Sequence, residues 1–311
     1  MIAELERRLG PGLLRVGVPL APLTTFRVGG PAEYLVEAPD AASLVAAARA
    51  GRGLGLPVTL LGGGSNVLVA DEGICGLVVR PHGGAIEAVG EGLVRADAGV
   101  TLNSLVRWTI ARGLGGLEAW AGTPGTAGGA VFGNAHFRGA GIGGLVEQAR
   151  LLAPDGSVAD LRGTSLGFGY DRSRLQETGE ILVSVALRLR PGCAPDVLRA
   201  TARASLAHRK QTQPLHLPTA GCIFKNPDPC RDTLPEGMPP SAGALIDRAG
   251  LKGRAAGGAR VSTIHANFIV NEGKATAAEI LALIRLCRDE VRRQFGVELE
   301  LEIRLLGRIR L

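Results

Sequence analysis

Two glycine-rich segments of the sequence could bring the backbone close to a phosphate. Residues 61–66 read Leu-Gly-Gly-Gly-Ser-Asn, and five of the nine residues in 122–130 are Gly or Pro. Consecutive glycines let backbone N–H groups approach an anion, and hydroxyl and amide side chains add donors. Neither segment matches the Gly-x-Gly-x-x-Gly or P-loop pattern, so each is locally either a phosphate-binding loop or a plain turn. The candidate phosphate contacts are Gly62, Gly63, Gly64, Ser65 and Asn66, and Gly122, Thr123, Gly125, Thr126 and Gly129.

A thiol, a cation and an amide lie close together in residues 221–227, which read Gly-Cys-Ile-Phe-Lys-Asn-Pro. The thiol is Cys222, the cation is Lys225 and the amide is Asn226. An isolated cysteine is most often a small buried hydrophobic residue, and a lone lysine is most often a solvated charge. By itself this segment therefore fits a site or an ordinary part of the fold.

Two further groups carry less local information. Glu302 lies on the charged face of an amphipathic segment, where spacing does not distinguish it from Glu298 or Glu300. Residues 168–173, Phe-Gly-Tyr-Asp-Arg-Ser, form a polar loop before a strand. Local chemistry assigns neither of them a function.

The elements that must position these segments are helices and short strands. Asp40 is an N-cap for a helix that ends near Gly51, and residues 276–279 form a capping box for a helix that runs to Phe295. Residues 297–305 alternate between apolar and charged side chains, which predicts a half-buried strand. The other predicted helices are 101–111, 196–210 and 241–249, and the other predicted strands are 58–61, 77–80, 93–96, a hairpin around 154–156, and 181–189. Hairpins followed by a helix-bearing second part predict the α+β class rather than a doubly wound sheet.

Composition excludes several classes of protein. The 311 residues include 46 glycines, much of which we attribute to compositional bias, and the net charge is +6. No run of five Lys or Arg residues occurs, so nothing in the sequence favours nucleic acid. The five cysteines are odd in number and contain no Cys-x-x-Cys, which argues against a disulfide framework or a metal site. The charged N-terminus and the absence of an 18-residue apolar run predict a cytoplasmic protein without a membrane span.

Proline and glycine residues near positions 191–195 suggest a domain boundary there. This Pro-Gly-Cys-Ala-Pro run follows a predicted strand and precedes a predicted helix. We therefore expect one part from 1 to 195, built of subdomains 1–80 and 81–195, and a second from 196 to 311. The C-terminal strand could pack back on the first part.

Nine segments, taken in order, resemble the UDP-N-acetylenolpyruvoylglucosamine reductase family. Together they span roughly residues 24–307. The segments are 25–30, 61–68, 116–130, 168–170, 220–227, 241–247, 250–253, 265–271 and 302–304.

The resemblance implies a flavoenzyme of peptidoglycan precursor synthesis. It implies an FAD-binding part with the vanillyl-alcohol-oxidase-type fold, followed by a smaller α+β substrate-binding domain. FAD is bound without a covalent link, and the two glycine segments become its binding loops. NADPH reduces the flavin and leaves, and the enolpyruvyl ether of UDP-N-acetylglucosamine is then reduced to UDP-N-acetylmuramate. NADPH and this UDP-sugar are thus the implied partners.

The same resemblance implies roles for single residues. Cys222 stands where the family has a proton donor, usually serine, and a thiol is a far stronger acid than a hydroxyl. Glu302 matches a glutamate that acts, with an arginine, on the substrate carboxylate and the developing enolate. Tyr170, Lys225 and Asn226 match substrate-binding positions, the latter two near the nucleotide diphosphate.

The chain departs from the family pattern beside Tyr170. The family arginine directly follows this tyrosine, but here Asp171 occupies that position and Arg172 comes next. One hypothesis is that a local backbone shift lets Arg172 take the catalytic role. The other is that Asp171 points inward and catalysis is weak.

Two length differences also matter. Residues 228–240 form an insertion that is either a lid or a surface excursion, and we favour the excursion. The chain between Ile181 and Lys210 is too short for an extra tyrosine-bearing loop, so it resembles the shorter subclass. The alternatives that remain are a flavin oxidoreductase of the same fold with another substrate, and an FAD-binding paralogue impaired by Asp171.

Overall fold

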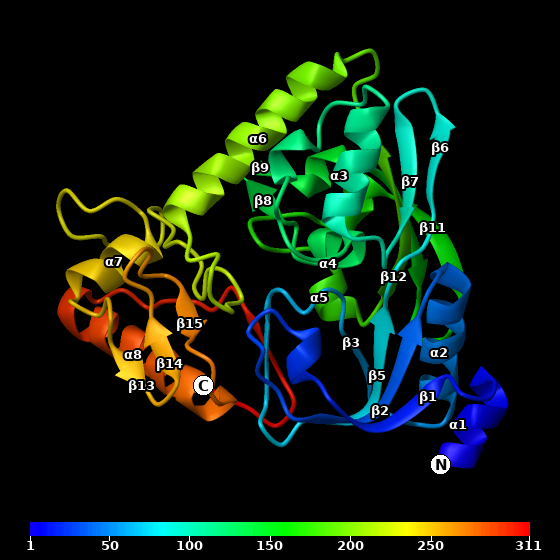
Figure 1. Cartoon of the computed structure of the whole chain (residues 1–311), viewed down its shortest axis with the longest axis horizontal. Coiled ribbons are helices and arrows are strands. Elements are labelled where there is room, and N and C mark those ends of the chain that lie inside the picture. Colours follow the sequence, from blue (N-terminus) through cyan, green and yellow to red (C-terminus); the bar gives the residue numbers. More distant parts are fainter. Residues whose placement is uncertain (138) are drawn as a thin grey trace. The chain divides into compact units, whose positions relative to one another are not determined.

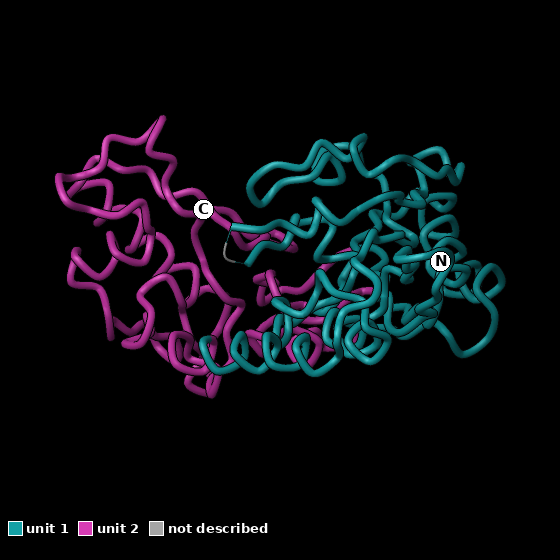
Figure 2. The backbone as a smooth tube through the Cα atoms, turned by 90° about the horizontal axis from the view of Figure 1, so that it is seen from above, with its two compact units in different colours: residues 1–16, 34–63, 76–208 teal, residues 17–33, 64–75, 209–311 magenta. Residues whose placement is uncertain are grey.

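The computed structural model describes residues 1–137 and 139–311, and the chain forms two compact units (Figures 1 and 2). Unit 1 comprises residues 1–16, 34–63 and 76–208, and unit 2 comprises residues 17–33, 64–75 and 209–311. These extents differ from the expected division at residue 195. Two N-terminal segments belong to unit 2, and the last change of unit lies inside helix α6 (Pro195–Thr212).

A four-stranded sheet has the order β1-β2-β5-β3. Its strands are β1 (Leu14–Pro19), β2 (Pro31–Ala38), β5 (Ile74–Pro81) and β3 (Val58–Leu60), and β3 runs parallel to β5. Helix α2 (Ala41–Gly53) joins β2 to β3 and packs against α1 (Ile2–Leu9). The Asp40 carboxylate accepts a hydrogen bond from Ser43 N at 2.7 Å, which confirms the predicted N-cap.

A five-stranded antiparallel sheet lies within unit 1, in the order β11-β10-β12-β7-β6. The strands are β6 (Ile86–Gly90), β7 (Leu93–Asp97), β10 (Val146–Leu152), β11 (Val158–Arg162) and β12 (Ile181–Arg188). Strands β10 and β11 form the predicted hairpin. Helix α4 (Ala127–Phe132) packs on β12 and β7 and contacts α3 (Leu102–Ala111).

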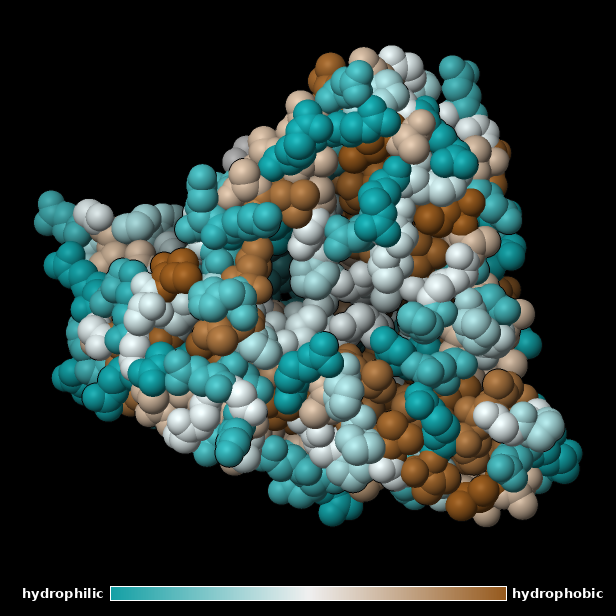
Figure 3. All heavy atoms as spheres, viewed as in Figure 1, coloured by the Kyte–Doolittle hydropathy of each residue, from teal (hydrophilic) through white to brown (hydrophobic). Residues whose placement is uncertain are grey.

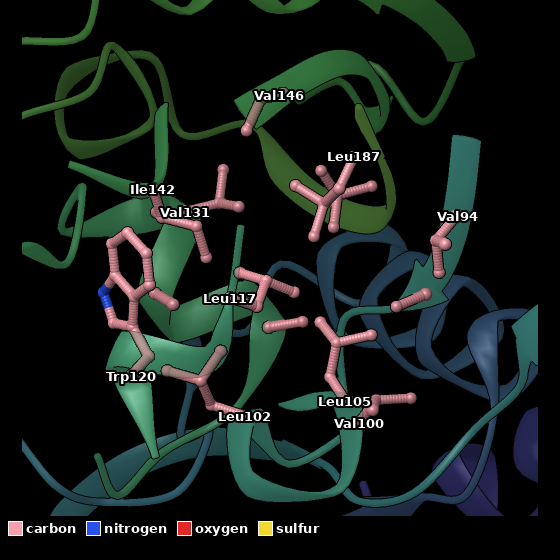
Figure 4. Packing of buried hydrophobic residues seen from close by; sticks show 14 of the residues in the cluster. Val94, Val100, Leu102, Leu105, Leu117, Trp120, Val131, Ile142, Val146 and Leu187 are labelled. Atoms are coloured by element: carbon pink, nitrogen blue, oxygen red, sulfur yellow. The ribbon is translucent and has the colours of Figure 1, made fainter. Parts of the chain in front are cut away.

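The core beneath α3 and α4 holds the second glycine segment in place. Leu102 and Leu105 of α3, Val131 of α4 and Trp120 converge in this core (Figure 4). The Trp120 indole N–H donates to Ala135 O at 3.3 Å, which ties the core to the turn after α4. Short elements complete the unit: η2 (Glu118–Trp120), β8 (His136–Phe137), β9 (Ala140–Gly141), η3 (Ile142–Leu145), η4 (Gly163–Leu166) and α5 (Leu175–Thr178).

Unit 2 is built around helix α8 (Ala277–Phe295). Thr276 and Glu279 form both hydrogen bonds of the predicted capping box. The unit also contains η1 (Ala21–Leu23), β4 (Val67–Val69), α7 (Ala242–Arg248), β13 (Ala255–Ala256), β14 (Ala259–Val261), β15 (Ile269–Asn271) and β16 (Arg304–Leu306). Strand β16 pairs in parallel with β4, so the last strand closes on an N-terminal segment.

The predicted strand over 297–305 is wrong in extent. Val297, Leu299 and Ile303 are buried as the alternation predicts, but only Arg304–Leu306 forms a strand. The preceding residues run beside residues 223–225: Lys225 N donates to Glu300 O, and Glu302 N donates to Ile223 O, each at 2.9 Å. Burial therefore follows the alternation, whereas regular pairing depends on partners distant in the sequence.

The helix and sheet content confirms the α+β class. On the face shown in Figure 3, hydrophilic and hydrophobic residues are interspersed. Within residues 1–137 and 139–311, no helix combines the length and the apolar character that a bilayer crossing requires.

Candidate functional site

The glycines at positions 62 and 63 lie against the second glycine segment in unit 1. A Cβ atom on Gly63 would fall 2.6 Å from the Cα atom of Gly125, and a Cβ on Gly62 would fall 2.8 Å from Thr126 Oγ1. Real Cβ atoms essentially never come within 3.0 Å of another heavy atom in this way. The two loops thus pack against each other in a way that only glycine allows.

Helix α3 fixes the second glycine segment from the other side. Asn103 Oδ1 accepts a hydrogen bond from Gly122 N at 2.8 Å, and Leu102 N donates to Gly125 O at 3.0 Å. Thr126 caps α4, and its hydroxyl oxygen accepts from Gly129 N at 3.2 Å. The N–H groups of Gly122 and Gly129 are thus bonded within the protein. The shape of this segment is set before any ligand binds.

The remaining residues of the first glycine segment belong to unit 2. Gly64 has a φ of +61°, and a Cβ there would lie 2.2 Å from Leu23 O, so this position requires glycine. The Asn66 side-chain N–H donates to Glu302 O at 3.1 Å, and Arg304 N donates to Asn66 O at 2.9 Å. Asn66 thus holds the backbone on both sides of Ile303.

Cys222 and Glu302 are brought together within unit 2. Cys222 forms a β-bridge with Phe268, and the next residue, Ile223, accepts the backbone hydrogen bond of Glu302. Both side chains are partly exposed. Residues 80 positions apart in the sequence thus lie on neighbouring backbone segments.

Sequence reasoning missed Asn267 as the residue that shapes the Cys222 loop. Asn267 is 3% exposed, and its side chain accepts from Phe224 N at 2.9 Å and donates to Phe224 O at 2.8 Å. A buried amide that completes both backbone groups of one residue holds that residue rigidly. The one feature of the sequence that could have identified Asn267 is its position in segment 265–271, which resembles the family.

Arg209, which sequence reasoning took for an ordinary helix residue, was also missed. It is 8% exposed, and burial lowers the pKa of its guanidinium, while its interaction with Cys222 acts in the opposite direction. A buried cation near a thiol favours the thiolate and so makes the thiol a stronger acid. Helix periodicity does not reveal that α6 ends against this loop.

Lys225 and Asn226 extend from the same loop. Lys225 Nζ lies 3.8 Å from Oε2 of the Glu300 carboxylate. The other oxygen of this carboxylate, Oε1, pairs with Arg231 at 3.0 Å. Asn226 Oδ1 accepts from Ala242 N at 3.1 Å, at the start of α7. Residues 228–240 contain turns but no helix or strand, and Leu234 and Met238 pack on the unit 2 core.

The tyrosine loop, residues 168–173 of unit 1, does not place Arg172 as the first hypothesis expects. The Arg172 guanidinium pairs with Glu177 at 2.7 Å, and both side chains are 61% exposed. Asp171 instead turns inward and is only 9% exposed, whereas the Tyr170 side chain is exposed. The positive φ of Asp171, 51°, reverses the backbone here and sends the two adjacent side chains in different directions. The predicted role of Arg172 requires it to leave Glu177.

A metal site finds no support in the described residues. Within 1–137 and 139–311, no group of three or more His, Cys, Asp or Glu side chains is arranged to hold a metal ion. All five cysteines are free thiols. Unit 1 thus offers two glycine loops that pack main chain against main chain, and unit 2 offers a loop that carries Cys222 and Lys225 beside the segment of Glu302.

Two family models match the chain. The model described as "UDP-N-acetylenolpyruvoylglucosamine reductase, C-terminal domain" matches residues 213–306, and the model described as "FAD binding domain" matches residues 32–162. The two matches contain most of the predicted site residues. The first contains Cys222 and Glu302, and the second contains both glycine segments.

Similar proteins carry the same family name. A UDP-N-acetylenolpyruvoylglucosamine reductase of Anaeromyxobacter is 44% identical over 98% of this chain and 92% of its own length. The reductase 2 of Symbiobacterium thermophilum is 42% identical over 96% of this chain and 93% of its own length. The crystal structure of the Thermus caldophilus reductase superimposes with a TM-score of 0.78 at 35% identity, covering 94% of this chain and all of that chain.

Proposed function

Because this chain belongs to the UDP-N-acetylenolpyruvoylglucosamine reductase family, we propose that it is the FAD-dependent oxidoreductase of that name. Its substrate is UDP-N-acetyl-3-O-(1-carboxyvinyl)-glucosamine and its product is UDP-N-acetylmuramate. NADPH is the electron source, and the reaction belongs to peptidoglycan precursor synthesis in the cytoplasm. The resemblance in sequence over almost the whole chain is the observation that carries this proposal.

The residues of unit 1 fit FAD. Gly63 packs main chain against the main chain of Gly125, which leaves no room for a Cβ atom between the two loops, and glycine-rich loops of this kind can present backbone N–H groups to a pyrophosphate. Gly62, Gly63, Gly125 and Thr126 would line the cofactor, with Gly64, Ser65 and Asn66 continuing the first loop. When bound, FAD supplies the hydride chemistry that amino-acid side chains lack.

Cys222 is the proton donor in this proposal. Reduction of the enolpyruvyl double bond adds a hydride to C3 and a proton to C2, and the thiol gives up that proton to become a thiolate. An unperturbed thiol has a pKa of about 8.5, and Arg209 nearby favours the thiolate that forms. The thiolate recovers its proton from solvent before the next turnover.

Glu302 and Lys225 orient the substrate in this proposal. Backbone hydrogen bonds hold the two residues on neighbouring segments of the chain. Lys225 N donates to Glu300 O, and Glu302 N donates to Ile223 O. Lys225 would attract the diphosphate, and Asn226 would add a hydrogen bond to it. Glu302 would stabilise the enolate that develops before proton transfer.

The deciding experiment is NADPH oxidation in the presence and absence of the enolpyruvyl substrate. We expect rapid turnover only when both are present, with UDP-N-acetylmuramate as the product. NADPH oxidation that does not depend on the UDP-sugar would refute the proposal and favour a flavin oxidoreductase with another substrate.

Cys222→Ala separates the two halves of the reaction. Because the thiol acts only when the substrate is protonated, flavin reduction by NADPH should stay near the wild-type rate. Product formation should fall by a factor of about 100 or more, the usual contribution of a positioned acid. Stopped-flow absorbance measures the first step and product analysis the second. Cys75→Ala, an exposed cysteine outside the site, is the matched control. Equal loss of both steps in Cys222→Ala would rule out its role as donor.

A further inference from the structure

A histidine and an aspartate form an ion pair in the tyrosine loop of unit 1. The Nδ1 atom of His136 lies 2.9 Å from Asp171 Oδ1. The carboxylate is 9% exposed and the imidazole 31% exposed, so the acidic end of the pair is buried and the basic end reaches toward the surface. A carboxylate at this distance from Nδ1 orients the imidazole ring.

The environment of Asp171 makes it depend on this histidine. Within the part of the chain that the structure describes, Asp171 Oδ2 is buried and has no hydrogen-bond partner. A buried carboxylate with one unsatisfied oxygen is costly unless a cation compensates it. Arg172, the adjacent cation, pairs with Glu177 instead. The His136 ring is the partner that the geometry supplies.

The pair is held rigidly by its neighbours. Gly169 and Arg172 exchange backbone hydrogen bonds around Asp171, and Gln176 Nε2 donates to Asp171 O at 2.9 Å. On the histidine side, Asn134 bridges the two loops, donating to Gly169 O at 2.7 Å. The pair therefore has a fixed orientation that does not depend on a ligand.

The same contacts tie the pair to the second glycine segment. Helix α4 is capped by Thr126 in that segment and ends at Phe132, four residues before His136. The Phe132 carbonyl accepts from Ser173 Oγ at 2.7 Å and from Gln176 Nε2 at 3.0 Å. The six-residue helix is about 9 Å long. Thus the pair lies at the far end of a short helix that starts in the proposed FAD loop.

An exposed aromatic ring completes the arrangement. Tyr170 is 51% exposed, and its ring centroid lies 4.9 Å from that of His136. The ring thus flanks the His136 end of the pair, which is the more exposed end. A partly exposed imidazole N–H beside a tyrosine can donate a hydrogen bond to an anionic oxygen.

We infer that His136, oriented by Asp171, binds an anionic oxygen of the UDP-sugar substrate through a ring N–H. Asp171 is a positioning residue that acts through His136. The inference rests on the proposed function, which supplies a substrate with two kinds of anionic oxygen, the enolpyruvyl carboxylate and the diphosphate.

The test compares His136→Gln, Asp171→Asn and the double variant with the wild type. Losing a hydrogen bond to a charged group should lower kcat/KM for the enolpyruvyl substrate about 10- to 100-fold in His136→Gln. Asp171→Asn should lower the same parameter, and it should add nothing to His136→Gln, because the aspartate acts through the histidine. Flavin content and the KM for NADPH should stay at wild-type values. His82→Gln, at an exposed histidine of unit 1, is the matched control.

A second ligand identifies the anionic oxygen. UDP-N-acetylglucosamine carries the diphosphate but no carboxylate. Unchanged inhibition by it in His136→Gln assigns the histidine to the carboxylate, and inhibition weakened to the same degree as substrate binding assigns it to the diphosphate.

Three results would overturn the inference. They are unchanged kcat/KM in His136→Gln, additive losses in the double variant, and a loss of flavin content that accounts for the lost activity. A wild type that does not turn over the UDP-sugar overturns the proposed function itself, whereas the first three results leave that function intact.

Discussion

His265 in unit 2 shows how burial changes the pKa of a residue near the site. Burial lowers its pKa from the ordinary value of 6.5, and Lys252 lowers it further. Its Nδ1 accepts a hydrogen bond from Asn267 N at 3.3 Å, the same residue that holds the Cys222 loop. A neutral His265 is thus part of the support for that loop.

The depressed pKa predicts a loss of stability in acid. The unfolded chain binds the His265 proton more readily than the folded chain, so its contribution is complete above pH 6.5 and is lost as the pH falls below that value. His265→Asn keeps an acceptor for Asn267 N but cannot titrate. We expect a smaller difference in the free energy of unfolding between pH 7.5 and pH 5.5 than in the wild type, measured by urea denaturation. The exposed His82→Asn should leave this difference unchanged, and an equal effect of both variants would contradict the assignment.

Residue roles were the part of the site that local chemistry could predict least. Cys222 and Glu302 were candidates only through resemblance, because a lone thiol and one of three glutamates have no local signature. Asn267 was missed since its two bonds to Phe224 exist only after distant segments meet. Asp171 was noticed as a departure, but its partner His136 could not be predicted, because the pairing depends on two loops joined by tertiary structure.

At the scale of elements, the glycine loops and their supporting helices give the sharpest prediction. Gly63→Ala places a methyl group against the main chain of Gly125, and Gly125→Ala puts a side chain at a φ of +115°, where only glycine is unstrained. Overpacking of this kind costs about 1–3 kcal/mol, so we expect FAD affinity to fall about tenfold or more. The flavin-to-protein absorbance ratio after dialysis measures this.

Two glycines serve as matched controls. A methyl group on Gly53 would meet only the mobile end of Arg8, and one on Gly129 would lie 3.6 Å from Thr126 Oγ1, an ordinary contact. Gly53→Ala and Gly129→Ala should both retain flavin. If Gly129→Ala loses as much flavin as Gly125→Ala, the loss does not arise from the close approach of the two loops.

Elements with local signals were predicted well. The caps of α2 and α8 and the β10–β11 hairpin depend on residues within a few positions of one another. The segment 297–305 shows the limit: its burial was predicted from alternation, but its hydrogen bonds go to Ile223, Lys225 and Asn66. The alternation of apolar and charged residues cannot predict these partners, because they are distant in the sequence.

At the scale of the whole molecule, unit 2 is discontinuous in sequence. Its core combines residues after 209 with Phe26, Val28 and Leu68 from the N-terminal segments. The Asp71 carboxylate accepts hydrogen bonds from the first two residues of α8, Ala277 N at 2.8 Å and Ala278 N at 3.0 Å. These contacts explain why a boundary at 195 could not describe the unit, since only the fold brings the three segments together.

A fragment of residues 209–311 should therefore not fold on its own. It lacks three core side chains, the β4 partner of β16 and the Asp71 cap of α8. Removing a buried Phe alone costs about 3–5 kcal/mol, a large share of the stability of a small domain. Circular dichroism during urea titration should show no cooperative transition. A fragment that unfolds cooperatively would contradict this, and the full-length chain under the same conditions is the control.

The pairing of β4 with β16 also sets an order of events on the ribosome. The chain changes unit after residues 16, 33, 63, 75 and 208. Residues 64–75 leave the ribosome early, yet their partner strand begins at Arg304. At about 5–20 residues per second, they wait roughly 12–50 s during synthesis. Unit 1 has all its segments once residue 208 has emerged, so it can fold while unit 2 still lacks its closing strand. We therefore expect the apolar residues Phe26, Val28 and Leu68 to lack part of their core until the segment that contains β16 has emerged.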